Sequence, residues 1–254
     1  MATELTWLGH AAFRVDTPGG KRIYVDPFLN GNPTCPPSEV EPERCDLVLV
    51  THGHGDHVGT AGRTDGGSDV ADLAQRTGAK VFGPAGLIQT LIDVGWVTAE
   101  QGVRFGKGGT VTPLGPQVKV TQVRAEHSSE MTIVDPATKK TRTYVGGEPA
   151  GFIIETENGV KIYHMGDTGL FGDMKLIGEY YKPDVVLIPI GGHFVMDPRD
   201  AAYATREMLK PKHAIPIHYG TFPVLKGTPQ EYQSFLGPSS TQVHPLSPGD
   251  KLTF

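Results

Sequence analysis

The heptad from Thr51 to His57 reads Thr-His-Gly-His-Gly-Asp-His and follows the apolar run Leu47–Val50. It places three imidazoles and a carboxylate just after what the run predicts to be a buried strand. Gly53 and Gly55 let the backbone turn sharply, so neighbouring side chains can converge on one point. Imidazole and carboxylate together suit zinc, iron, manganese or nickel. The heptad therefore predicts a metalloenzyme, with further ligands expected from distant parts of the chain.

The chain has 254 residues and a formal net charge of −5. This length is at the upper end for one domain and can bury a large core, so we expect a single domain over residues 1–254. The acidic balance lacks the basic surface that nucleic-acid binding requires. We therefore expect a small-molecule substrate and no nucleic-acid partner.

The N-terminal residues Met1–Trp7 have no basic segment followed by an apolar stretch. No secretory signal is therefore expected. No apolar run approaches membrane-spanning length, so no membrane span is expected either. The cysteines Cys35 and Cys45 are predicted to be reduced thiols, because disulfide-stapled secreted domains are usually smaller and richer in cysteine. These features indicate a cytoplasmic enzyme.

Short apolar or alternating runs, separated by turns and amphipathic segments, predict strands and helices in alternation. The expected strands include Leu5–Leu8, Ala12–Val15, Arg22–Val25, Leu47–Val50, Val81–Phe82, Val118–Thr121, Phe152–Glu155, Val160–Tyr163, Val185–Ile190, Ala214–Ile217 and Lys251–Phe254. Helices are expected after the capping residues Ser68, Asp197 and Thr228, and around Leu87–Ile92. Hairpins followed by helices occur in both halves, which favours an α/β fold of the αββα sandwich type.

Candidates for the missing ligands follow other apolar runs. His127 comes after Val120–Ala125, and His218 comes directly after Ala214–Ile217. Asp167 follows Val160–Tyr163 in the same way. Each is a metal-ligand type of side chain at an expected strand end, where the heptad also lies.

With these residues the chain resembles the metallo-β-lactamase superfamily, whose motif is His-x-His-x-Asp-His followed by His, Asp and His at later strand ends. The resemblance covers nearly the whole chain and implies the metallo-β-lactamase fold with two divalent metal ions. Zinc is the first candidate, with manganese, nickel and iron as alternatives. The implied ligands are His52, His54 and His127 for one metal and Asp56, His57 and His218 for the other, with Asp167 bridging.

A narrower resemblance joins the chain to a largely uncharacterised bacterial hydrolase family, which is similar to ascorbate-6-phosphate lactonase and to the phospholipase D that cleaves N-acyl phosphatidylethanolamine. The motifs that carry it are Trp7–His10, Asp26–Phe28, Gly147–Phe152, Gly191–Phe194 and His218–Phe222. The stretch Asp135–Tyr144 has the character of an insertion that would alter the pocket rim. Oligomers are common in this fold, so a homo-oligomer is compatible with the resemblance.

The implied activity is hydrolysis of an ester, lactone or phosphodiester by a hydroxide shared between two metals. Asp56 and Asp167 would lie beside this hydroxide, and Asp56 is the candidate to handle protons. Tyr219 and His193 are the other catalytic candidates. His10, Asp26 and His193 are candidates to contact substrate or to orient ligands from behind, Asp26 by a hydrogen bond to a ligand histidine. His164, His213 and His244 receive no role.

Other functions compete with this one. Persulfide dioxygenases of the superfamily carry a similar ligand set with a single iron, so a mononuclear iron enzyme stays open. A phosphodiesterase acting on nucleic acid is a further alternative, which the acidic charge opposes. Flavin-linked diiron relatives carry an acidic residue where this chain has His54. A binding protein without catalysis would be expected to have lost ligands.

Overall fold

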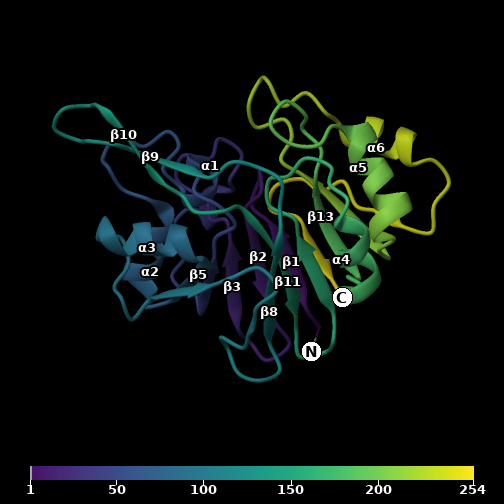
Figure 1. Cartoon of the computed structure of the whole chain (residues 1–254), viewed down its shortest axis with the longest axis horizontal. Helices are drawn as coiled ribbons and strands as arrows, with labels where there is room; N and C mark the ends of the chain where they lie inside the picture. The colour runs from purple at the N-terminus through teal and green to yellow at the C-terminus, as the bar shows by residue number, and fades with distance from the viewer. Residues whose placement is uncertain (1) are drawn as a thin grey trace.

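The strands are short runs of β-branched, aliphatic and aromatic residues that alternate between two buried faces, as the computed structural model of residues 2–254 shows (Figure 1). In β4 (Leu47–Leu49), Leu47 and Leu49 pack into the core between the sheets, and Val48 packs into the core beneath the helices. Alternation with both faces apolar is what a strand in the middle of a layered fold requires. The strands thereby build three cores, one between the sheets and one outside each.

Two seven-stranded sheets form the centre of the molecule. The first has the order β16 (Lys251–Thr253), β1 (Glu4–Trp7), β2 (Phe13–Asp16), β3 (Arg22–Val25), β4, β5 (Lys80–Pro84) and β6 (Gly102–Phe105). The second has the order β15 (Gln242–Val243), β14 (His213–Ile217), β13 (Val185–Pro189), β12 (Lys161–His164), β11 (Ala150–Glu155), β8 (Lys119–Arg124) and β7 (Thr110–Val111).

The two sheets share one pairing pattern. In the first, β1, β2 and β3 pair antiparallel, and β3 to β6 pair parallel. In the second, β8, β11 and β12 pair antiparallel, and β12 to β15 pair parallel. Parallel strands end at the same edge of a sheet, so the loops after β3, β4, β12 and β14 gather at one end of the sandwich.

Helices cover the outer faces of both sheets (Figure 1). Those on the first sheet are α2 (Asp69–Thr77) and α3 (Ala85–Asp93), and those on the second are α4 (Met174–Tyr181), α5 (Pro198–Tyr203) and α6 (Pro229–Leu236). The short α1 (Gly55–Val58) lies in the heptad, and a 3₁₀ turn (Pro37–Glu39) lies in the long loop before β4. The predicted αββα sandwich is confirmed. No helix within residues 2–254 is long and apolar enough to cross a membrane.

Helix ends follow the predicted signals, with one difference. Ser68 caps α2 by accepting from the Ala71 N–H, and Thr228 forms the predicted capping box with Glu231. The helix expected to run through to Leu209 is regular α-helix only to Tyr203, and Ala204–Leu209 continues it as a π-helix. Helix α4 was not among the helices expected from the sequence.

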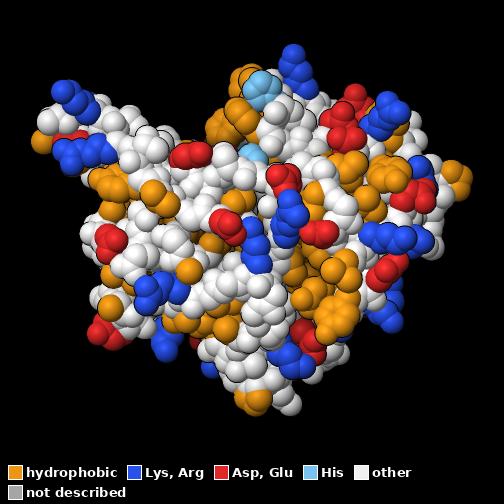
Figure 2. Space-filling model, in the orientation of Figure 1, with side chains coloured by type: hydrophobic (Ala, Val, Ile, Leu, Met, Phe, Trp, Pro, Cys, Tyr) orange, Lys and Arg blue, Asp and Glu red, His pale blue; other side chains and the backbone are white. Residues whose placement is uncertain are grey.

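The stretch Asp135–Tyr144, expected to be an insertion, belongs to a two-stranded hairpin of β9 (Glu130–Val134) and β10 (Thr141–Val145). The hairpin projects from the body at the upper left of Figure 1. Its tip carries the exposed side chains of Lys139, Lys140 and Arg142, which form the blue group in Figure 2. The base of the same hairpin reaches the heptad, as described below.

Candidate metal centre

Seven predicted ligands meet at one end of the sandwich, because each follows a strand that ends there. His52, His54, Asp56 and His57 follow β4, His127 follows β8, Asp167 follows β12, and His218 directly follows β14. Two groups result, in each of which the ligand atoms lie within 4.8 Å of one another. The first cluster is His52, His54, His127 and Asp167, and the second cluster is His10, Asp56, His57 and His218.

In the first cluster three imidazole nitrogens face one another. Nδ1 of His54 lies 3.1 Å from Nε2 of His52 and 3.3 Å from Nε2 of His127. Nε2 of His127 lies 3.5 Å from Oδ2 of Asp167. The arrangement presents three nitrogens and one carboxylate oxygen to a common centre, which is a donor set that zinc and neighbouring divalent ions accept.

The first cluster is supported by the loop after β8 and by the base of the hairpin. Ser129 accepts a hydrogen bond from the Gly53 N–H (3.0 Å) and donates to the Gly146 carbonyl (2.7 Å). The outer nitrogen of His54, Nε2, lies 3.3 Å from a carboxylate oxygen of Glu130. That carboxylate can fix the imidazole's tautomer. Neither Ser129 nor Glu130 was predicted, since only the fold brings them to the heptad.

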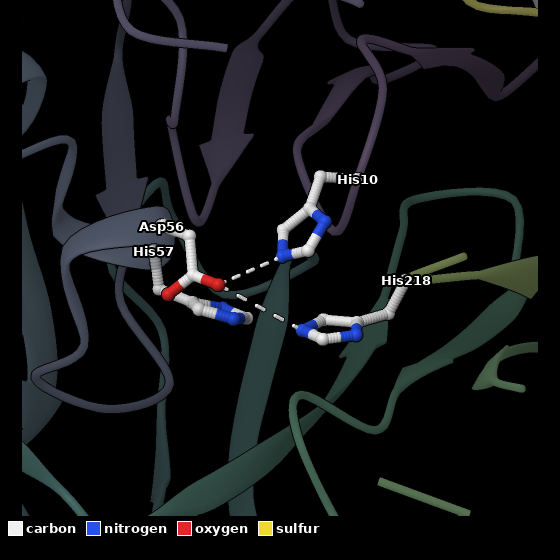
Figure 3. A group of neighbouring side chains, drawn as sticks. All are labelled: His10, Asp56, His57 and His218. Carbon is white, nitrogen blue, oxygen red and sulfur yellow. Dashed lines mark hydrogen bonds and ion pairs between the residues drawn. The ribbon is translucent and has the colours of Figure 1, made fainter. Parts of the chain in front are cut away.

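In the second cluster His10 and His218 both turn Nε2 toward the same oxygen of Asp56 (Figure 3). The distances to Oδ2 of Asp56 are 3.0 Å from His10 and 4.0 Å from His218. His10 comes from the turn between β1 and β2, whereas His57 and Asp56 come from α1. His10 was expected from the sequence to contact substrate or to orient ligands, and its place in a ligand cluster was not expected.

Asp26 fixes the orientation of His57 from behind. It is fully buried and accepts hydrogen bonds from the Thr51 N–H and the Thr51 hydroxyl, both at 2.7 Å. Its Oδ2 also lies 2.8 Å from Nδ1 of His57. Burial opposes protonation of His57, but Asp167 and Asp26 outweigh it and hold the pKa of His57 well above its usual range. With Nδ1 donating to the Asp26 carboxylate, Nε2 is the nitrogen left for a metal, which would displace its proton. Thr51 does the same for His52, whose Nδ1 lies 3.0 Å from its hydroxyl.

Asp167 lies between the clusters. Its Oδ1 is 3.1 Å from Nε2 of His57, and its Oδ2 is 3.0 Å from Nε2 of His218. The same Oδ2 is 3.5 Å from His127 and 3.9 Å from His52. One carboxylate therefore contacts histidines of both clusters, as a bridging ligand would.

Burial sets the protonation of two histidines in the centre. It lowers the pKa of His10 to about 4, and the neighbouring His218 acts in the same direction. Burial likewise holds the pKa of His52 well below its usual range, with His57 adding to the effect. Both imidazoles are therefore neutral near pH 7, which is the form that ligates metals.

The carboxylates show the opposite balance. Burial acts to raise the pKa of Asp56, but the hydrogen bond from His10 and the nearby His57 outweigh it and lower the pKa. Burial also opposes ionisation of Asp167, yet His218 and His57 hold its pKa well below the usual range. Both carboxylates are therefore ionised and can ligate cations.

Buried polar atoms without partners provide a test of whether metal fits here. Nε2 of His57, Nε2 of His218 and Oδ1 of Asp167 are all buried. The two imidazole nitrogens lie 3.1 and 3.0 Å from oxygens of Asp167, but none of the three atoms forms a hydrogen bond within residues 2–254. Leaving such atoms unpaired is costly, and nearly all buried polar groups in proteins are satisfied. The three atoms face the cluster centres and are of metal-ligand type, so a bound cation would satisfy them. The residues present fit the metals that the resemblance implies.

Two predicted catalytic residues lie outside both clusters. His193 is exposed on the loop after β13, with its ring against Phe194. The ring of Tyr219 stacks on Trp7, and its hydroxyl lies 3.5 Å from the Leu246 carbonyl. Roles for His193 and Tyr219 stay predictions.

The histidines without an assigned role also lie outside the clusters. His164 is buried, with its Nε2 2.8 Å from the Ala11 carbonyl. His213 and His244 contact each other, with 3.0 Å between ring nitrogens.

Comparison with known proteins agrees with the fold. A family model described as "Beta-lactamase superfamily domain" matches residues 4–218. A UPF0173 metal-dependent hydrolase of Cupriavidus necator is 52% identical over an alignment that covers 99% of this chain and 86% of that protein. A second UPF0173 metal-dependent hydrolase, from Polaromonas, is 51% identical over an alignment that covers 99% of this chain and 90% of that protein.

A solved structure is also similar over the full length. Igni18, described as a novel metallo hydrolase from Ignicoccus hospitalis, superposes with a TM-score of 0.80 at 33% identity, covering 100% of this chain and 99% of the other. With the geometry of the two clusters, these similarities show that the chain belongs to the beta-lactamase superfamily and, within it, to the UPF0173 family of metal-dependent hydrolases.

Proposed function

We propose that the protein is a binuclear hydrolase that cleaves an ester, lactone or phosphodiester bond of a small molecule. The observation that carries this proposal is the position of Asp167, whose two oxygens contact histidines of both clusters at 3.0–3.9 Å. A carboxylate shared in this way is suited to holding two cations next to each other. Zinc is the first candidate, and manganese, nickel and iron are the alternatives.

Two divalent ions bound here would lower the pKa of water and polarise an electrophilic oxygen of the substrate. The protein's own contribution is orientation. Asp26 and Thr51 fix His57 and His52 from behind, so that the inner nitrogens of both rings stay aimed at the centre. Asp56 is 23% exposed, whereas the three histidines of its cluster are 0–1% exposed. Asp56 is thus the member of that cluster that a substrate entering from solvent can reach, and its lowered pKa makes its carboxylate a weak base there.

Charge and cluster completeness bear on the alternatives. The net charge of −5 supports a small molecule over nucleic acid as the substrate. The second cluster offers four donors besides Asp167, and this set supports two ions over the single iron of a persulfide dioxygenase.

The test is the metal content of the purified protein by elemental mass spectrometry, followed by hydrolysis assays with lactones, carboxylic esters and phosphodiesters. About two equivalents of divalent metal per chain and metal-dependent hydrolysis are expected. A matched control is His244→Ala, which removes an imidazole far from either cluster and should leave both readouts unchanged. A single iron with no hydrolysis of any substrate class would contradict the proposal.

A further inference from the structure

We propose that His10 is a ligand of the second metal ion, in addition to Asp56, His57 and His218. The inference rests on the proposed binuclear function, to which it adds a donor that the metal motif does not contain. Figure 3 shows the four side chains, which come from three separate segments and point toward one another. Their ligand atoms all lie within 4.8 Å of one another.

The spacing of the donor atoms fits a single coordination shell. Donors about 2.1 Å from an octahedral ion lie about 3.0 Å apart when adjacent and about 4.2 Å apart when opposite. Nε2 of His10 is 3.0 Å from Oδ2 of Asp56, and Nε2 of His218 is 4.0 Å from the same oxygen. Nε2 of His218 is in turn 3.0 Å from Oδ2 of Asp167. His10 therefore has the distance to Asp56 that an adjacent donor would have.

The backbone holds His10 in place as it holds His218. Both residues have left-handed backbone conformations, with φ of 54° at His10 and 55° at His218. Such conformations are strained for residues with a Cβ and persist where the surrounding structure enforces them, often at functional sites. The two turns are directly joined, since the His218 N–H donates to the His10 carbonyl at 3.0 Å. The Trp7 indole N–H donates to that carbonyl as well, also at 3.0 Å.

Packing holds the His10 ring at the second cluster. It is fully buried, its centroid lies 3.9 Å from that of His218, and Phe28 and Phe222 pack edge-on against it. Within residues 2–254 the ring makes one hydrogen-bonding contact, from Nε2 to Asp56, and its Nδ1 has no partner, so ligation through Nε2 would place the ring proton on Nδ1. The fold thus presents one nitrogen of His10, and presents it to the second cluster.

A metal preference follows from the donor count. With Asp167, His10 brings the protein donors of this site to five, from His10, Asp56, His57, Asp167 and His218. Catalytic zinc usually has three protein ligands and one open position. Five protein donors and one open position suit a six-coordinate ion such as manganese, nickel or iron(II) better. The second site is therefore expected to prefer such an ion over zinc.

The test is a titration of metal-free full-length protein with Co²⁺. Calorimetry measures the affinity of each site, and visible absorption reports the coordination of the bound ion. His10→Ala should weaken one of two sites by more than the 10–100-fold typical of losing a group behind a ligand. It should also change the absorption of that ion. His54→Ala should affect the other site, and the control His244→Ala should affect neither.

His10→Gln separates a ligand from a positioning role, because its amide can still donate to Asp56 but ligates poorly. If His10 is a ligand, the glutamine variant should lose affinity and change absorption as the alanine variant does. Wild-type affinity and absorption in the glutamine variant, or unchanged binding in the alanine variant, would overturn the proposal. If wild-type protein binds only one ion, the binuclear function fails. His10 is then still judged by whether its alanine variant or that of His54 loses that ion.

Discussion

The two clusters share Asp167 but are held by different kinds of structure. The first has an exposed support in addition to the buried Thr51 and Ser129, since His54 is 27% exposed and the Glu130 carboxylate beside it is 60% exposed. The second depends on buried supports, since Asp26 and His57 are fully buried and joined at 2.8 Å. A hydrogen bond to an exposed partner competes with water, whereas a buried one cannot be replaced. We therefore expect the second site to be the more rigid and the slower to exchange its ion.

The largest effect is expected from Asp167→Ala, which removes the carboxylate common to both clusters. Each remaining donor set loses its shared oxygen, so both ions should be lost and hydrolysis should fall roughly 10³-fold or more. Elemental mass spectrometry and rate measurements check this. If the Asp167→Ala protein kept one full equivalent of metal per chain, one cluster would bind its ion independently of the other, and the bridging role would be wrong.

Asp26→Asn should act mainly on the second site, because Asp26 contacts His57 directly and reaches His52 of the first site only through Thr51. Asparagine keeps the shape but cannot accept all the hydrogen bonds from Thr51 and His57 that the carboxylate accepts. Stability should fall by about 2–3 kcal/mol, because buried donors lose a charged partner. Metal affinity of the second site should fall about 10–100-fold. Urea unfolding of the metal-free protein and metal titration measure the two effects separately.

An equal loss of metal affinity at both sites in Asp26→Asn would contradict the idea that Asp26 mainly supports the second site. The half-buried carboxylate of Asp46, which accepts from the Arg22 N–H, offers a matched control. Asp46→Asn should leave metal affinity unchanged.

Ser129→Ala should act on the first site through the backbone. The Gly53 N–H would lose its buried partner, which costs about 1–3 kcal/mol. The heptad turn would loosen between His52 and His54, so affinity at the first site should fall a few-fold, about 0.5–1 kcal/mol. Thermal unfolding and Co²⁺ titration provide the measurements. A second-site effect larger than the first-site effect would argue against this assignment.

The smallest effect is expected from Glu130→Gln. The Glu130 carboxylate is exposed and lies 3.3 Å from Nε2 of His54, so water can take its place. Exposed ion pairs contribute about 0–1 kcal/mol, so affinity at the first site should fall less than about 5-fold. The same titration applies. A loss as large as that of Asp26→Asn would show that exposure does not distinguish the two clusters.

Much of the fold and ligand inventory could be predicted from local sequence. A continuous apolar run such as Leu47–Val50 indicates a strand because both faces of a strand in the middle of a layered fold are buried. The capping residues Ser68 and Thr228 mark helix starts because their side chains satisfy the first free N–H groups. Candidate ligands were identified in the same way, as polar residues at the ends of apolar runs. The family resemblance then supplied their grouping.

Residue partnerships across the sheets had no such local signal. His10 and His218 are far apart in the chain and meet because β1 and β14 end, and β2 begins, at one edge of the sandwich. Ser129 and Glu130 reach the heptad because the loop after β8 passes beside it. The path of the loop after β13 likewise leaves His193 exposed and outside both clusters. Local periodicity predicts where the strands end, and therefore which candidate ligands lie at strand ends. Which of them share a centre follows from sheet order, packing and strained turns, which residue spacing does not encode.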